Sequence, residues 1–116
     1  MVMRLLIPEE SLAAFLACLG IGTLQAIRTG ALRPEAGTWT LGPPRVWGPL
    51  VSRSAVPREI IEVFQTCDEL AAMRQLLPET FDAEVGKLIE RLERQLARIE
   101  DPVWTISWDT PAEGTS

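Results

Sequence analysis

The sequence predicts a small, mainly α protein of the α+β kind: a bundle of four to five helices with short strands at residues 1–7 and 103–109 that can pair. Three observations predict this fold. Apolar residues recur with helical spacing over residues 79–100. A long apolar run between residues 9 and 29 suits the central helix of a bundle. The segment 103–109 alternates strictly between apolar and polar residues. At 116 residues the chain has the length of one domain.

The first two elements are set by Pro8. Residues 1–7 are short and apolar and stop at this proline, which predicts an N-terminal strand. Proline suits the first position of a helix, and Glu9 and Glu10 favour the positive end of a helix dipole. We therefore expect a helix over 9–29, with Gly30 placed to end it.

Small residues recur every four positions along this helix: Ala14, Cys18, Gly22 and Ala26. Bulky residues lie on a different face: Leu12, Phe15, Leu16, Leu19 and Ile27. Small side chains let a neighbouring helix approach closely, so we expect a helix against this row and a loss of stability when Gly22 is enlarged to leucine. Gly20 and Gly22 do not complete a dinucleotide fingerprint, because Gln25 stands at the third glycine position and the pair lies inside a helix.

The middle of the chain leaves two alternatives open. Residues 34–41 fit either a helical turn or a strand, and their helical neighbours favour the turn. Residues 44–57 are rich in proline and glycine and indicate a loop with a short turn of helix. A helix over 57–77 opens at Pro57. Thr66 and Glu69 fit a capping box, so this helix either breaks at Thr66 or continues with a kink.

The helix over 79–100 has one buried stripe: Phe81, Val85, Leu88, Ile89, Leu92, Leu96 and Ile99. Its basic and acidic residues lie on two different flanks of the helix. One flank is basic: Lys87, Arg91, Arg94 and Arg98. The other flank is acidic: Asp82, Glu93 and Glu100, with Glu90 at its outer edge. Either the two flanks meet complementary neighbours within the fold, or they form a docking surface for a partner protein or a second copy of the chain.

Four tryptophans complete the set of candidate residues. In the segment 103–109, Trp104 and Trp108 share a face with Ile106, and we expect them in the core. Trp39 and Trp47 lie in the proline-rich segment, where an exposed indole would be a binding hot spot. We take 1–110 as a single domain and 111–116 as a mobile tail.

The amino-acid composition argues against nucleic-acid binding, metal binding and catalysis. A net charge of −5 and a pI of about 4.7 argue against nucleic acid as a partner. The chain has no histidine, the commonest metal ligand and general base. We therefore expect no catalytic, cofactor or metal site; an enzyme using Cys67, Asp68 or Glu69 is the alternative. Cys18 and Cys67 are expected as two reduced, buried thiols.

The apolar run over 12–27 contains Thr23 and Gln25 and is shorter than the roughly 20 residues of a membrane span. Glutamates precede it, whereas a signal peptide places a basic region there. We expect a cytoplasmic protein without a membrane partner. Ten of its basic residues are arginines, a bias typical of GC-rich bacterial genomes.

The segments "LGIGTLQAIRTGAL" and "PREIIEVFQTCDELAAMRQLLPETF" resemble a family of small uncharacterised bacterial proteins, a domain of unknown function. The resemblance covers about residues 12–92 and implies no catalytic residue. By analogy in size, acidity and lack of catalytic groups, the chain is similar to immunity proteins that neutralise bacterial toxins. A cognate toxin domain is then the expected protein partner, and a self-associating structural or regulatory protein, such as a homodimer, is the alternative.

Overall fold

The computed structural model describes residues 2–100, 102 and 104–109. Within these residues it contains six α-helices, one 3-10 turn and two strands, so the mainly helical α+β prediction is confirmed, with more helices than expected. In chain order the elements are β1 (Arg4–Leu6), α1 (Glu9–Arg28), α2 (Pro34–Thr40), α3 (Pro44–Trp47), η1 (Gly48–Leu50), α4 (Arg58–Cys67), α5 (Leu70–Leu76), α6 (Phe81–Ala97) and β2 (Ser107–Asp109).

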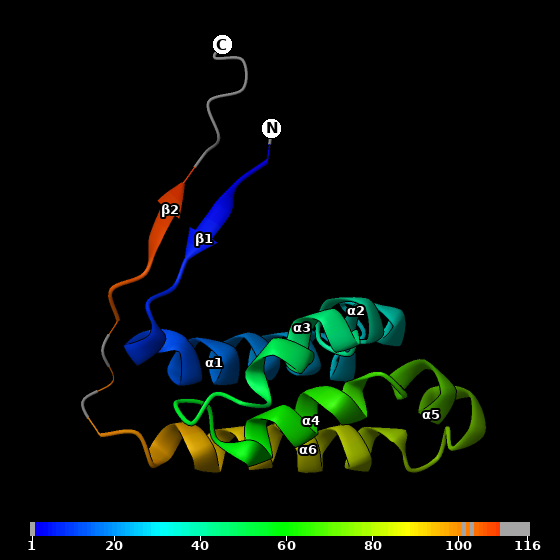
Figure 1. Cartoon of the computed structure of the whole chain (residues 1–116). Helices are drawn as coiled ribbons and strands as arrows, with labels where there is room; N and C mark the ends of the chain where they lie inside the picture. The colour runs from blue at the N-terminus through cyan, green and yellow to red at the C-terminus, as the bar shows by residue number, and fades with distance from the viewer. Residues whose placement is uncertain (1, 101, 103, 110–116) are drawn as a thin grey trace.

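The helical body is built around the antiparallel pair α1 and α6 (Figure 1). Arg28, at the end of α1, pairs with Asp82 at the start of α6. Helix α4 packs on both of these helices, and α2 packs on α1 and α5. The side chains that are fully buried at the centre come from these helices and the turns between them: Leu24, Leu41, Ile60, Val63, Phe64, Leu70, Val85 and Leu92. The predicted stripe of the last helix supplies much of this core.

The close helix contact lies at Gly20 rather than along the predicted row of small residues. A Cβ at Gly20 would stand 2.6 Å from Leu92 Cδ1 and 3.2 Å from Phe64 Cε1. A Cβ at Gly22 would meet nothing within 4 Å. Cys18 is exposed as well, so the expectation of a buried thiol there is wrong, whereas Cys67 is buried. The expectation of a helix packed against Cys18 and Gly22 is therefore wrong, because α6 contacts the face of α1 that carries Gly20 and Leu24.

The helix boundaries follow most of the sequence signals. Gly30 has φ 86°, a left-handed conformation that glycine adopts without strain, and it ends α1. The ambiguous segment 34–41 is helical. The helix over 57–77 is broken, but the break follows Cys67. The predicted capping box is wrong, because Thr66 lies inside α4 and its hydroxyl donates to the Glu62 carbonyl at 2.9 Å.

The two strands form an antiparallel ribbon in which Leu5 lies opposite Trp108. The predicted pairing of the chain ends is confirmed, although the strands are shorter than 1–7 and 103–109. The ribbon projects from the N-terminal end of α1, away from the helices (Figure 1). Trp104 and Trp108 consequently remain 55% and 67% exposed, so the expectation that they lie in the core is wrong.

Helix α1 has 20 residues and, by length and composition alone, could cross a membrane. Length therefore does not exclude a span, contrary to the argument from residues 12–27. In the structure α1 packs against α2, α4 and α6, and its buried face contributes Leu16, Ala17, Leu24 and Ile27 to the core. It occupies the position of a central bundle helix. Residues 111–116, where we expect a mobile tail, lie outside the described residues.

Candidate protein-binding surfaces

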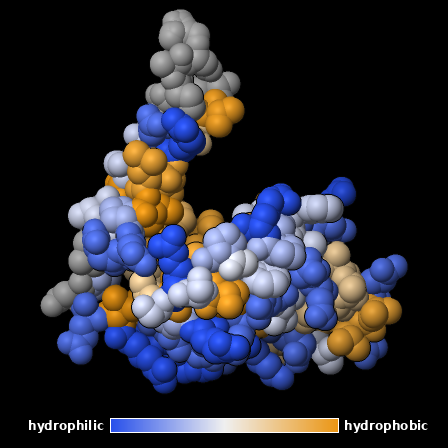
Figure 2. Space-filling model, in the orientation of Figure 1, coloured by the Kyte–Doolittle hydropathy of each residue, from blue (hydrophilic) through white to orange (hydrophobic). Residues whose placement is uncertain are grey.

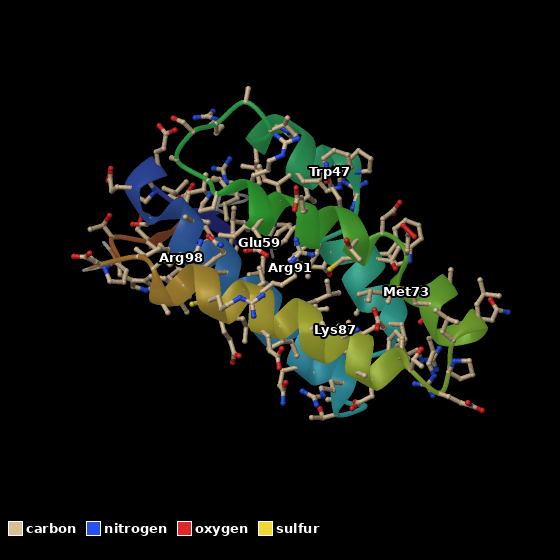
Figure 3. All side chains as sticks on the ribbon, turned by 90° about the horizontal axis from the view of Figure 1, so that it is seen from below. Trp47, Glu59, Met73, Lys87, Arg91 and Arg98 are labelled. Carbon is tan, nitrogen blue, oxygen red and sulfur yellow. The ribbon has the colours of Figure 1, made fainter. Side chains whose placement is uncertain are left out.

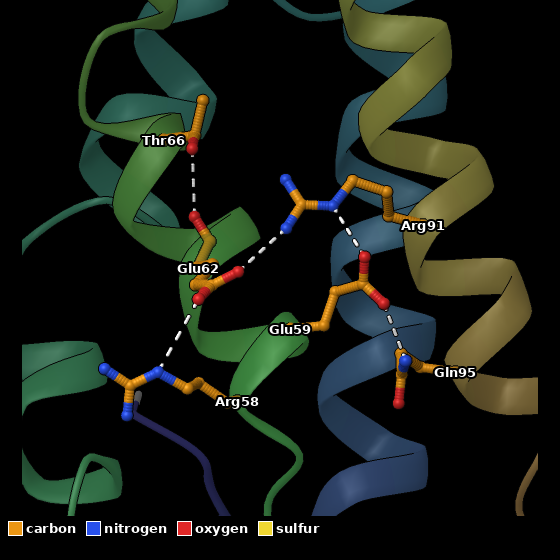
Figure 4. A network of polar contacts seen from close by, with 6 residues as sticks. All are labelled: Arg58, Glu59, Glu62, Thr66, Arg91 and Gln95. Atoms are coloured by element: carbon orange, nitrogen blue, oxygen red, sulfur yellow. Dashed lines mark hydrogen bonds and ion pairs between the residues drawn. The ribbon is translucent and has the colours of Figure 1, made fainter.

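The basic flank of α6 faces α4, where Arg91 bridges two carboxylates (Figure 4). Arg91 Nε donates to Glu59 Oε2 at 2.9 Å, and Arg91 Nη2 donates to Glu62 Oε1 at 3.1 Å. Gln95 Nε2 donates to the other oxygen of Glu59 at 2.7 Å. Arg58 reaches Glu62 from the preceding turn of α4 at 3.6 Å. Arg91 is thus tied into the fold, and a partner would have to displace these contacts to use it.

These hydrogen bonds perturb the acidity of Glu59. The hydrogen bonds from Arg91 and then Gln95 hold the pKa of this carboxyl below its ordinary value of 4.5, against a smaller opposing effect of burial. Glu59 therefore stays ionised to lower pH than an ordinary glutamate, which preserves the contact between α4 and α6.

The other charged candidates are exposed on α6 or directly after it, Lys87 and Arg98 among them (Figure 3). Lys87 pairs with Glu84 at 3.0 Å, within the helix. Arg94 and Arg98 are exposed on the basic flank, and Glu90, Glu93 and Glu100 are exposed on the other side. In the part of the chain that the structure describes, these five make no ion pair. Within the fold, Arg91 and Asp82 thus lie beside side chains of opposite charge. The remaining charged candidates face solvent.

The two tryptophans of the proline-rich segment are not one site. Trp47 is half-buried, and its Nε1 donates to the Gly42 carbonyl at 2.8 Å. Trp39 is 67% exposed on α2. Trp47 therefore stabilises the turn that carries it, whereas Trp39 presents its ring to solvent.

A shallow apolar groove runs between α1 and α6, with a volume of about 530 Å³. It is lined by Cys18, Ile21, Gly22, Glu93, Leu96 and Ala97. The small residues that the sequence assigns to a buried contact form part of its wall. Glu93 lies at this groove, away from the basic flank of its helix.

The apolar face of the ribbon departs most from the sequence-based expectations. Residues directly opposite each other in an antiparallel pair project on the same side. The pairing places Leu5 and Trp108 on one side of the ribbon. Continuing the alternation past the ends of β1 and β2 adds three further apolar residues to this side: Met3, Ile7 and Ile106. We call the whole set the ribbon face.

The opposite side of the ribbon is mixed, because it carries the exposed side chain of Leu6 as well as charged residues. It carries an ion pair of 2.7 Å between Arg4 and Asp109. On the ribbon face, Met3 is 49% and Trp108 is 67% exposed. Figure 2 shows hydrophobic side chains along the projecting ribbon, above a helical body whose visible face is largely hydrophilic. The sequence signal for this surface was the apolar composition of residues 1–7, which we used only to predict a strand.

Two contacts hold the base of the ribbon to α1. The rings of Phe15 and Trp104 lie 6.3 Å apart between centroids. Ser11, which is buried, accepts a hydrogen bond of 3.3 Å from the Thr105 backbone amide. The ribbon is anchored at its base, and its outer part extends beyond these contacts.

Cys67, a residue of the alternative enzyme hypothesis, is poorly placed for covalent chemistry. Burial raises the pKa of the Cys67 thiol to about 12, so its thiolate is scarce at neutral pH. No cluster of metal-binding side chains occurs within the described residues. Comparison of the chain with protein-family models, with curated proteins and with solved structures finds no match.

Proposed function

We propose that this protein is a non-catalytic protein-binding module whose partner covers the ribbon face. The observation that carries the proposal is the exposure of Trp108 and Met3 on a ribbon that stands away from the helical body. An apolar surface that a chain leaves uncovered on a projecting element is typical of an interaction site.

The chemistry of the ribbon face suits a protein partner. Tryptophan is enriched among the residues that carry most of the binding energy in protein interfaces. Trp108 is flanked on its own face by Leu5 and Ile106, which give it an apolar surround. The carboxylates that face solvent elsewhere, Glu90, Glu93 and Glu100, favour a partner with a basic surface.

The most concrete form of the proposal is an immunity protein that binds and neutralises a cognate bacterial toxin domain. Such a protein acts by covering or distorting an active site, so it needs a binding surface and no reactive group of its own. The acidic charge of the chain, its lack of histidine and the burial of Cys67 support this form.

The test is coexpression with candidate toxin domains, taken first from any secreted protein that proves to be encoded beside its gene. We expect the wild-type protein to restore growth, and Trp108→Ser to lose most of the protection. Trp39→Ser is the matched control, because Trp39 is also 67% exposed but lies on α2. Circular dichroism checks that each variant keeps its helices.

Two results would contradict the proposal. Protection by Trp108→Ser equal to that of the wild type would show that the ribbon face is not the binding surface. Growth arrest by the toxin despite a folded wild-type protein, with no complex in gel filtration, would contradict the immunity form.

A further inference from the structure

The ribbon is incomplete as a sheet. A two-stranded ribbon is marginally stable in water, and a third strand or a packed helix is normally needed. Beyond its base, this ribbon has neither: β1 pairs with β2 alone in the described part of the chain. The radius of gyration is 15.2 Å, against about 13 Å for a compact chain of this length. The ribbon stands away from the helical body (Figure 1).

The outer edge of β1 is suited to strand pairing. Residues 2–7 are apolar apart from Arg4, whose charge is already neutralised by Asp109. Natural sheet edges are protected by charged side chains, proline, bulges or very short strands. Residues 2–7 carry no proline or lysine, although β1 itself has only three residues. Apart from the pairing with β2, the described backbone gives residues 2–7 no hydrogen-bond partner.

We propose that β1 pairs in antiparallel fashion with β1 of a second copy, so that two ribbons form one four-stranded sheet with the order β2-β1-β1-β2. This inference does not depend on the proposed function, because it uses the edge of the ribbon and leaves the ribbon face available.

The alternation of side chains limits the possible registers, and an axis at Leu5, the middle of β1, is the one that pairs all three of its residues with those of the copy. Pairing β1 with its copy must keep Leu5 and Ile7 on the same side in both chains, which requires the two-fold axis to pass through a residue position. An axis at Arg4 would set the two arginines opposite each other, and like charges in that position repel. An axis at Leu5 sets Leu5 opposite Leu5, Arg4 opposite Leu6 and Met3 opposite Ile7.

This register also separates the two helical bodies. In each chain α1 follows β1 after Pro8, so each body lies beyond the carboxyl end of its own strand. Antiparallel strands point these ends in opposite directions. The two bodies therefore stand at opposite ends of the shared sheet, and the two ribbon faces join into one apolar surface.

The register is tested by disulfide trapping in a Cys18→Ser background, which removes the exposed native thiol. In the Leu5→Cys variant the two introduced thiols would be directly opposite, on Cα atoms about 4.5–5.5 Å apart, inside the range of a disulfide. In the Leu6→Cys variant the two introduced thiols would be diagonal neighbours, on Cα atoms about 7–8 Å apart, which is too far. Leu6→Cys is thus the matched control for Leu5→Cys.

We expect mild oxidation at low micromolar protein to link Leu5→Cys into dimers at least about five-fold more completely than Leu6→Cys. A mixture of Arg4→Cys and Leu6→Cys chains should form mixed dimers. Sedimentation of the unmodified protein should give twice the 12.8 kDa chain mass.

A monomer in sedimentation together with no trapping of Leu5→Cys would overturn the proposal. If the two variants formed disulfide-linked dimers equally well, the disulfides would come from random collision. This result would overturn the register with the axis at Leu5. A dimer that Leu5→Cys does not trap would place the contact elsewhere, as in the groove between α1 and α6, and would equally overturn the pairing of β1.

Discussion

The Arg91 guanidinium lies between Glu59 and Glu62, donating at 2.9 Å to the first and at 3.1 Å to the second. Because the two glutamates are on one face of α4 and the arginine is on α6, this side chain constrains the rotation of one helix against the other. Charge-assisted hydrogen bonds of this kind depend on geometry as well as on charge.

Replacing Arg91 with methionine should destabilise the protein more than the same change at Lys87. Arg91→Met leaves two carboxylates facing each other without their shared cation, whereas Lys87 makes a contact within its own helix and is well exposed. Urea denaturation of the two variants measures the difference. Equal free energies of unfolding would show that the bridge between α4 and α6 contributes nothing.

The same bridge predicts a pH dependence. The folded pKa of Glu59 lies below 4.5, its ordinary value. Its contribution to stability is therefore fully present above about pH 4.5 and is lost as the pH falls through the folded pKa. The difference in unfolding free energy between wild type and Glu59→Gln should be largest at neutral pH and shrink toward about pH 3. A difference that stays constant over this range would contradict the assignment.

The two glycines of α1 should respond in opposite directions to alanine. Gly20→Ala places a methyl group 2.6 Å from the Cδ1 atom of Leu92, a fully buried side chain with little room to move. It should destabilise the protein by about 1–3 kcal/mol. Gly22→Ala meets open space and should stabilise the helix by up to ~1 kcal/mol. Thermal unfolding of both variants measures the effects, and a reversed order would refute the packing of α1 on α6.

The two thiols should differ in reactivity. Cys18 is exposed, whereas Cys67 is buried with a pKa of about 12. At about pH 8 a chromogenic disulfide reagent should modify Cys18 rapidly and leave Cys67 unmodified until denaturant is added. Cys18→Ser is the control, because this variant should then show no fast reaction. Fast labelling of Cys67 in the folded protein would contradict its burial.

Local signals in the chain predicted most of the helices. Pro8, Gly30, Pro57 and Pro78 mark element boundaries, because proline restricts its neighbours and glycine adopts φ values that other residues avoid. The apolar period of residues 79–100 predicted the face of α6 that is buried. These properties depend on residues a few positions apart, so they can be read before any tertiary contact is known.

The face of α1 that packs against α6 could not be predicted from such local signals. Its row of small residues and its glycine at position 20 lie on different faces, and either face could have met a neighbouring helix. Leu92 and Phe64 come from distant parts of the chain, and their approach to Gly20 selects the buried face. The sorted charges of α6 were ambiguous for the same reason, since the Arg91 partners lie on α4.

The sequence by itself determined the helical class of this protein and its acidic, histidine-free composition, and it indicated that the two ends can pair. Only the tertiary structure decided that the paired ends stand away from the body, with Trp108 facing solvent rather than the core. The physical reason is that alternation specifies which residues share one side of a strand. It does not specify what covers that side, which depends on where the rest of the chain, or a second molecule, is placed.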